Sequence, residues 1–394
     1  SWSGSLSWGL YLACSWTWCI GMYLPVLLVR DFGAWSFAVF ALPNCLGAAA
    51  MGWTLRRPGA SAALVARHGA ACRVFSLVTI AFQWFFLWWT ALGSEGTRLP
   101  ALALVAGVVV LLATGRIAGE ARRPRWLAAG LFAASLACAA WFLLTTDLSI
   151  RPPAPLFPAS DLAALAPVVF FGFLLCPYLD LTFHQARQQT AEREGVAAFL
   201  IGFGVLFAIM ILFTLLYAPA LLGTAAGLGA AVVPALAPLP ILLHLGMQLG
   251  FTIGLHRGHV DAEAPASPAR LSGGLSIAAL FVGLGAAAFA RYAPPHAGLP
   301  MGEVVYRAFL AFYGLASPAY VWLCVIPRGV KATWPSVRSL AVFAGAVAVA
   351  APFYWLGFIE RQTWWLLPGL AVVLLARLAI PWQRAVPTPV PPSS

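Results

Sequence analysis

The segment FFGFLLCPYLDLTFHQAR, residues 170–187, starts as an apolar run and then carries a proline, an aspartate and a histidine. Pro177 has no amide hydrogen and clashes with the preceding turn, so the carbonyl of Phe173 loses its helical partner just before Asp180. We therefore predict that a helix in this segment kinks or unwinds at Pro177. The free-energy cost of such a break depends on whether the segment lies in water or in lipid. The composition of the chain indicates which.

The composition is that of a membrane protein. Of 394 residues, 62% are hydrophobic and 9% charged, and the mean hydropathy is +0.88, which excludes a water-soluble globule. The seven cysteines are scattered singly, without metal-ligand spacing, so we expect no metal site. The sequence contains no P-loop, dinucleotide fingerprint or zinc motif, and we expect no cofactor.

Twelve segments are long and apolar enough to cross a bilayer, which takes roughly 20 residues of helix. They are residues 6–29, 33–55, 71–93, 99–115, 126–146, 161–184, 196–218, 231–256, 272–291, 304–326, 337–358 and 363–383. The loops between them are too short to form a soluble domain with its own core. The proline-rich tail, 385–394, is expected to be disordered.

The basic residues set the expected orientation. Alternate loops hold sixteen on one side and six on the other, so the positive-inside rule places the larger set and both termini in the cytoplasm, with the protein in the inner (cytoplasmic) membrane. This role accounts for the net charge of +11, and we expect no nucleic-acid partner. The outer basic set is Arg30, Arg98, Arg151, Arg291, Arg307 and Arg361. The outer acids are Asp31, Glu95, Asp147, Asp161, Glu303 and Glu360.

Asp180 is the one acidic residue that does not lie in a loop or at the outer end of a predicted span. An ionised carboxylate in hydrocarbon costs a few kcal/mol or more, and broken backbone at that depth needs protein or a water-filled cavity beside it. His184 follows at i+4 on the same helical face, so the two side chains are candidates for a proton relay. The alternative is that the helix ends near Pro177, with Asp180 in the headgroups beside Arg187.

The first span has a similar interruption in SWTWCIGMYLPVLLVRDFG, residues 15–33. Pro25 frees the carbonyl of Gly21, and we expect the helix to open there. The dipeptides Tyr23-Leu24 and Tyr178-Leu179 occupy like positions in spans one and six. These spans are five helices apart, so they cross the membrane in opposite directions.

Two inverted five-helix halves, each opening with an interrupted helix, resemble the plan of LeuT-fold secondary transporters. Within that superfamily, GMYLPVLLVRDFGAWSFAVFALPNCLGAAAMGW, residues 21–53, is most similar to the sodium:solute symporter family. The resemblance implies an all-α polytopic membrane protein of about twelve helices with a central site between spans one, three, six and eight. The halves would be residues 1–155 and 156–330, followed by two further helices in 331–384.

Span eight carries His244, Gln248 and Thr252 on one helical face. They either line the central site or bond to a neighbouring helix. Sodium-coupled relatives usually use paired hydroxyls on this span, and residues 231–256 offer only Thr252, so proton coupling through Asp180 or His184, or no coupling, fits better. The candidate site residues are Gly21, Tyr23, Pro25, Pro177, Tyr178, Asp180, His184, His244, Gln248 and Thr252.

Further polar and aromatic residues are candidates for a cavity wall. Asn44 in span two and Gln83 in span three either line a cavity or hold helices together. The aromatic residues Trp16, Trp18, Tyr23 and Tyr178 could surround a small organic solute, with cation–π contact available.

Three functional hypotheses remain. The leading one is a secondary transporter whose partners are the bilayer and a small solute or ion. The second is a non-catalytic subunit of a larger membrane complex, with other membrane proteins as partners. The third, an intramembrane enzyme using Asp180 and His184 as acid and base, is disfavoured by the short loops, and we expect no catalysis.

Overall fold

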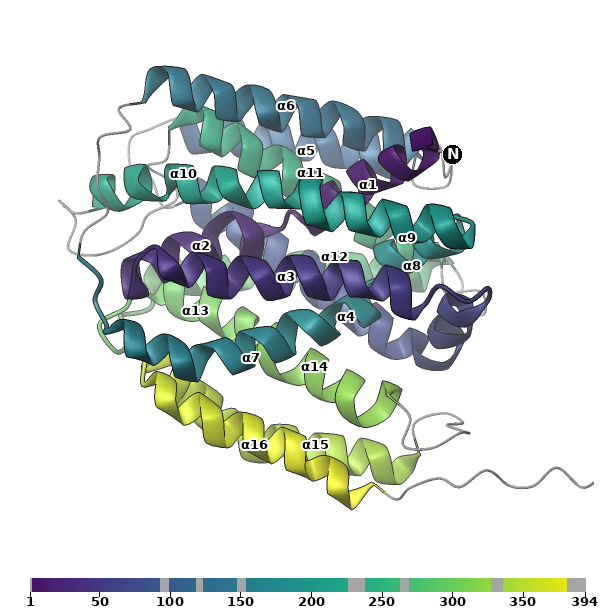
Figure 1. The fold of residues 1–394 in the computed structure, drawn as a ribbon. Helices are drawn as coiled ribbons and strands as arrows, with labels where there is room; N and C mark the ends of the chain where they lie inside the picture. Colours follow the sequence, from purple (N-terminus) through teal and green to yellow (C-terminus); the bar gives the residue numbers. More distant parts are fainter. Residues whose placement is uncertain are drawn as a thin grey trace, which may run out of the picture.

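The computed structural model describes residues 2–92, 99–117, 123–146, 154–225, 238–262, 269–326 and 336–380. Within these ranges the chain is a bundle of helices without β-strands (Figure 1). The first helices are α1 (Trp2–Trp16), α2 (Cys19–Phe32), α3 (Trp35–Thr54), α4 (Ala60–Leu92), α5 (Leu99–Ile117) and α6 (Arg123–Thr145). The later ones are α7 (Leu162–Leu175), α8 (Leu181–Gln188), α9 (Glu192–Ile201), α10 (Ala208–Ala225), α11 (Leu239–Ala262), α12 (Ala269–Tyr292), α13 (Met301–Ala311), α14 (Ser317–Tyr320), α15 (Val337–Tyr354) and α16 (Leu366–Ala376).

Short 3-10 and π-helical segments extend or interrupt these helices. They are η1 (Ala159–Asp161), η2 (Cys176–Leu179), η3 (Gly202–Phe207), η6 (Phe312–Ala316), η7 (Val321–Val325), η8 (Trp355–Ile359), η9 (Thr363–Trp365) and η10 (Arg377–Ala379). The pair α15 and α16 packs at the edge of the bundle opposite α5 and α6 (Figure 1). The proposed tail at 385–394 lies outside the described residues, and the division of the chain at 155 and 330 stays a prediction.

The helices fit a polytopic membrane protein. In the described residues, nine helical stretches are long and apolar enough to span a bilayer, and ten if the bent pair α1 and α2 forms one span. These ten match ten of the twelve predicted spans. The other two, 99–115 and 363–383, contain the shorter apolar helices Val105–Thr114 and Thr363–Ala379.

Glycines let helices approach closely at two places that matter for the site. A Cβ built on Gly250 of α11 would lie 2.1 Å from the carbonyl oxygen of Gly107 in α5. A Cβ on Gly47 of α3 would lie 2.1 Å from the carbonyl oxygen of Phe173, the group that Pro177 leaves without a helical partner. Small residues at helix contacts are typical of membrane bundles, and here they bring α3 against the end of α7.

The break between α7 and α8 lies where the sequence predicts it. The helix α7 ends at Leu175, η2 follows, and Asp180 has extended backbone angles (φ −82°, ψ 112°) before α8 begins. The Asp180 carboxylate accepts hydrogen bonds from the amide and hydroxyl of Thr182, each at 2.7 Å, and so caps α8. The helix α7 does end next to Pro177, as the headgroup alternative predicted, but Asp180 is 0% exposed and Arg187 donates to other groups, so its placement of Asp180 in the headgroups beside Arg187 is wrong.

The break in the first span lies before the predicted position. Helices α1 and α2 meet at a 58° bend across Thr17 and Trp18, and Pro25 lies inside α2, so the predicted opening at Gly21 and Pro25 is wrong. The physical reason lies in α10, whose Thr214 hydroxyl donates to the Gly21 carbonyl at 3.0 Å. With that carbonyl satisfied, the missing proline amide does not force the helix apart.

Candidate functional site

A cavity of about 80 Å³ reaches both broken helices. At one end its wall includes Trp16 and Trp18 from the first break and Cys176 from the second, together with Tyr313 of η6. At the other end the wall includes Asp31 of α2 and two arginines described below. The two interrupted helices, in spans one and six, therefore share one hollow. The other described residues of its wall lie in or next to spans two, ten, eleven and twelve, and not in spans three and eight, which the resemblance implied.

The inner wall of this cavity is aromatic. The Trp16 and Trp18 rings have centroids 4.5 Å apart, and Trp18 lies 5.6 Å from the Tyr313 ring. The Trp16 indole donates to the Asn44 side-chain oxygen at 2.6 Å, which holds that amide at the cavity wall. The result is a mostly apolar pocket with one oriented amide, a common design for small organic ligands.

The predicted aromatic wall is only partly correct. Trp16 and Trp18 line the cavity, whereas the Tyr23 ring packs against Phe86 and Tyr306, and the Tyr178 hydroxyl bonds to Thr54 at 2.7 Å. The sequence analysis missed Tyr313. A signal for it existed, because Pro318 leaves the carbonyl of Gly314 without its helical partner, and the chain forms a π-helical turn at residues 312–316.

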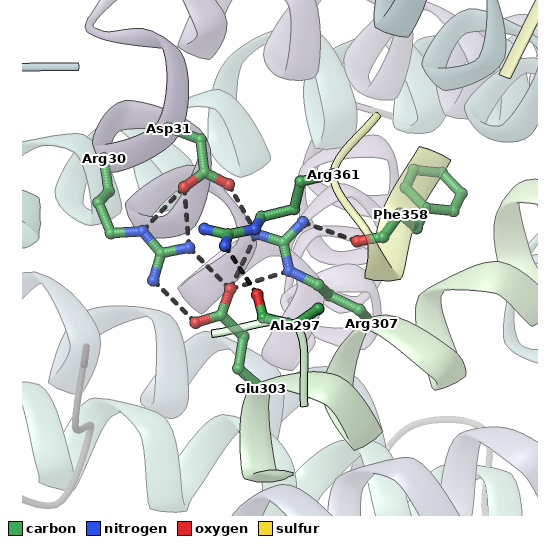
Figure 2. A network of polar contacts seen from close by, with 7 residues as sticks. All are labelled: Arg30, Asp31, Ala297, Glu303, Arg307, Phe358 and Arg361. Carbon is green, nitrogen blue, oxygen red and sulfur yellow. Dashed lines mark hydrogen bonds and ion pairs between the residues drawn. The ribbon is translucent and has the colours of Figure 1, made fainter. Parts of the chain in front are cut away.

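A buried ion network lies at the Asp31 end of the cavity (Figure 2). The Arg30 guanidinium makes two parallel hydrogen bonds of 2.7 Å to Glu303 and donates to Asp31 at 2.8 Å. Arg307 donates to Asp31 at 2.6 Å and to Glu303 at 2.8 Å, so all four carboxylate oxygens accept a charged hydrogen bond. Arg361 lies beside this group and also lines the cavity. These ion pairs join α2 to α13.

The polar side chains on one face of α11 mainly make hydrogen bonds that join helices. His244 Nδ1 lies 2.9 Å from the Ser135 hydroxyl of α6, and the Gln248 amide donates to the same hydroxyl at 3.0 Å. The Thr252 hydroxyl donates back to the Gln248 carbonyl at 3.0 Å. Of the two readings open for this face, bonding to a neighbouring helix is the one these contacts match.

The same face continues one turn further to His256, which the sequence analysis missed. Asp180 Oδ2 lies 3.9 Å from His256 Nε2, and both side chains are 0% exposed. Neither atom has a hydrogen-bond partner in the described part of the chain. The spacing of His244, Gln248 and Thr252, extended by four residues, is the signal that could have found it.

The predicted pairing of Asp180 with His184 is wrong. His184 Nδ1 lies 2.8 Å from the Ser61 hydroxyl and Nε2 lies 3.0 Å from the Tyr178 carbonyl oxygen. The physical reason is that Asp180 is the N-cap of α8, so its carboxylate turns toward the first amides of that helix and away from the i+4 position. Pro177 contributes the break itself, and His184 anchors α8 to Ser61 at the start of α4.

Of the comparisons with known proteins, the one with solved structures gives information on the fold. No family model and no curated protein matches the chain. Among solved structures it is similar to a Na⁺-coupled sialic acid symporter in its substrate-bound, outward-open state, with 12% identity, 97% of this chain and 91% of that chain covered, and a TM-score of 0.55. The chain thus shares the overall fold of that symporter, an all-α polytopic fold of the kind that the sequence resemblance to LeuT-fold proteins led us to expect.

Proposed function

We propose that this protein is a secondary transporter that moves a small organic solute across the membrane by alternating access. The observation that carries the proposal is the shared cavity, which reaches the break between α1 and α2 and the break between α7 and α8. In transporter folds, interrupted helices at mid-membrane supply the binding site, and movement of one repeat against the other changes the side of access. The fold likeness to a Na⁺-coupled symporter supports the same reading.

The solute would lie against Trp16, Trp18 and Tyr313, with the Asn44 amide as its oriented polar contact. With the predicted orientation, the end of the cavity at Asp31 and Arg307 lies on the outer side.

Sodium coupling finds little support in the groups that the family plan would use. The Gly21 carbonyl accepts from Thr214, and the neighbouring Met22 carbonyl accepts from the Tyr217 hydroxyl. The one hydroxyl of span eight, Thr252, donates to its own helix. Each of these groups already makes a hydrogen bond within the protein, which reduces the number of lone pairs or orientations left for an ion.

Uptake by purified protein in liposomes tests the proposal. A panel of small carboxylates, zwitterions, amines and sugars is offered to wild type, to Val169→Trp, which fills the cavity wall, and to Leu200→Trp on an exposed face of α9. We expect saturable uptake by wild type and Leu200→Trp and at least a tenfold loss in Val169→Trp. Equal uptake by all three proteins, or none by any, contradicts the proposal. In the latter case, a stoichiometric membrane partner on native purification would favour the subunit hypothesis.

A further inference from the structure

Two buried polar atoms face each other without a partner, and they belong to groups that can each carry a proton. Asp180 Oδ2 and His256 Nε2 are 3.9 Å apart, about 1 Å more than a hydrogen bond. In the described residues, both lack any other partner. Burying a carboxylate oxygen without a hydrogen-bond partner costs free energy. The arrangement therefore indicates that a ligand binds between the two atoms, either permanently or in one state of a cycle.

The other ends of both side chains are fixed. Asp180 Oδ1 is held by the Thr182 amide and hydroxyl at 2.7 Å, and His256 Nδ1 lies 3.0 Å from the Ser76 hydroxyl of α4. Because these contacts orient the carboxylate and the ring, the two open atoms stay directed at one another. A small shift between α8 and α11 would therefore make or break a direct hydrogen bond.

The surroundings leave the pair with one unbalanced negative charge. The titratable groups in electrostatic reach are Tyr11 of α1, Tyr313 of η6 and His259 of α11. His184, on the next turn of α8, is engaged with Ser61.

Arg187, the arginine nearest to Asp180 in the sequence, uses its hydrogen-bond donors on other groups. Its guanidinium donates to the carbonyls of Leu55 and Arg56 and to the Thr190 side chain. With Asp180 ionised and His256 neutral, the pair carries a net charge of −1 in a buried setting. One added proton makes it neutral, either as an acid and an imidazole or as an ion pair.

The ligand that fits this geometry is a proton. The described residues contain no group of three His, Cys, Asp or Glu side chains able to hold a metal ion. A hard cation such as Na⁺ or Ca²⁺ needs several oxygen ligands, whereas the pair offers one open oxygen and one nitrogen.

The pair is linked to the solute cavity through Trp18 and to a second polar hollow through His184 and Ser61. The Trp18 ring lines the cavity and lies 5.5 Å from the His256 ring. On the predicted cytoplasmic side, a polar hollow of about 370 Å³ is lined by Ser61 and Gln188, and Ser61 bonds to His184, one turn from Asp180. Movement at the breaks can thus change both the pair distance and its access to water.

We propose that Asp180 and His256 form a proton-binding pair, loaded from one side of the membrane and emptied to the other, which makes the proton the coupling ion. The inference rests on the proposed transport function and deepens it. The proton enters from water, is shared between carboxylate and imidazole without any other bond changing, and returns to water when α8 and α11 separate.

Proton binding can be measured without any knowledge of the solute. Infrared spectra of protein in liposomes are recorded across pH for wild type, Asp180→Asn, His256→Gln and the control His244→Gln, a buried histidine bonded to Ser135. We expect a titrating carboxyl signal that Asp180→Asn abolishes, that His256→Gln shifts in proton affinity by at least tenfold, and that His244→Gln leaves unchanged. The proposed proton-binding pair is refuted if wild type and His256→Gln titrate identically, or if no carboxyl signal depends on Asp180.

Coupling is tested in the uptake assay. In Asp180→Asn we expect accumulation driven by a pH gradient to fall at least tenfold, while exchange of solute at equal concentrations persists. Normal gradient-driven accumulation in this variant overturns the coupling proposal and leaves the transport function intact. If wild type moves no solute, the transport proposal fails, and the infrared titration still decides whether the proton pair exists.

Discussion

The protein buries carboxylates in two places and treats them differently. In the network between α2 and α13, all four oxygens of Asp31 and Glu303 accept hydrogen bonds from arginines, so both carboxylate charges are matched. At the α7–α8 break, Asp180 has one oxygen anchored and one that faces His256 at 3.9 Å. A matched network resists any change of charge, whereas an incompletely matched pair can gain or lose a proton at low cost. The first suits a structural joint and the second suits a switch.

The largest expected effect comes from breaking the matched network. Glu303→Gln leaves Arg30 and Arg307 without part of their buried counter-charge, and removing one partner of a buried pair costs about 3–5 kcal/mol of unfolding free energy. Equilibrium unfolding in detergent measures the loss. The control is Arg257→Ala, which removes an exposed i,i+4 pair with Asp261 and should cost less than about 1 kcal/mol. Equal stability of the two variants would refute the structural role of the network.

The next effect concerns the position of the α7–α8 break. Gly47→Ala puts a methyl group where the Phe173 carbonyl lies, and overpacking against backbone should cost about 1–3 kcal/mol. Gly130→Ala is the matched control, because a Cβ there meets nothing within 4 Å. Thermal unfolding of the two variants side by side gives the comparison. If Gly47→Ala is as stable as Gly130→Ala, then α3 does not hold the end of α7.

A smaller effect is expected at the incompletely matched site. Asp180→Asn keeps the side-chain oxygen that caps α8 and removes a charge that the described residues do not balance, so stability should change by less than about 1 kcal/mol. The same unfolding assay places this variant beside Glu303→Gln. A loss as large as that of Glu303→Gln would mean that Asp180 is held as a permanent ion, and the contrast between the two sites would collapse.

The smallest effect is a pH dependence at the surface. A hydrogen bond from His296 at 2.8 Å lowers the pKa of Glu360 below its ordinary value of 4.5. Because the folded-state pKa is the lower one, the contact stabilises fully above pH 4.5 and is lost as the pH falls through the folded-state pKa. Thermal unfolding between pH 7 and acid pH should show a slightly smaller decline in Glu360→Gln than in wild type, and a larger decline would reverse the assignment.

The sequence anticipated those features that follow from local chemistry. Hydropathy located the spans, and Pro177 located a break, because a missing amide acts on its own helix. Pro25 obeys the same rule, yet Thr214, far along the chain, supplies the missing donor. Asp180 was identified because it lies within a predicted span. Its pairing with His256 depends on how α8 packs against α11, which the sequence does not show.

The ion network shows the same division. The distribution of basic residues assigned all five members to one side of the membrane. The sequence could therefore predict that they lie near the same surface. The bidentate bond of Arg30 to Glu303 depends on the packing of α2 against α13, across 273 residues. Periodicity within a helix carries no information on that contact. The members are Arg30, Asp31, Glu303, Arg307 and Arg361.

Access to the cavity is the most direct test of alternating access. A single cysteine, Val169→Cys in a background with the seven native cysteines replaced, places a thiol on the cavity wall. Membrane-impermeant maleimide should label it from the side of the Arg30–Glu303 network in one condition and from the side of Ser61 in another, with solute or a pH gradient shifting the balance. A thiol that never reacts, or that reacts from one side alone under every condition, would contradict the account.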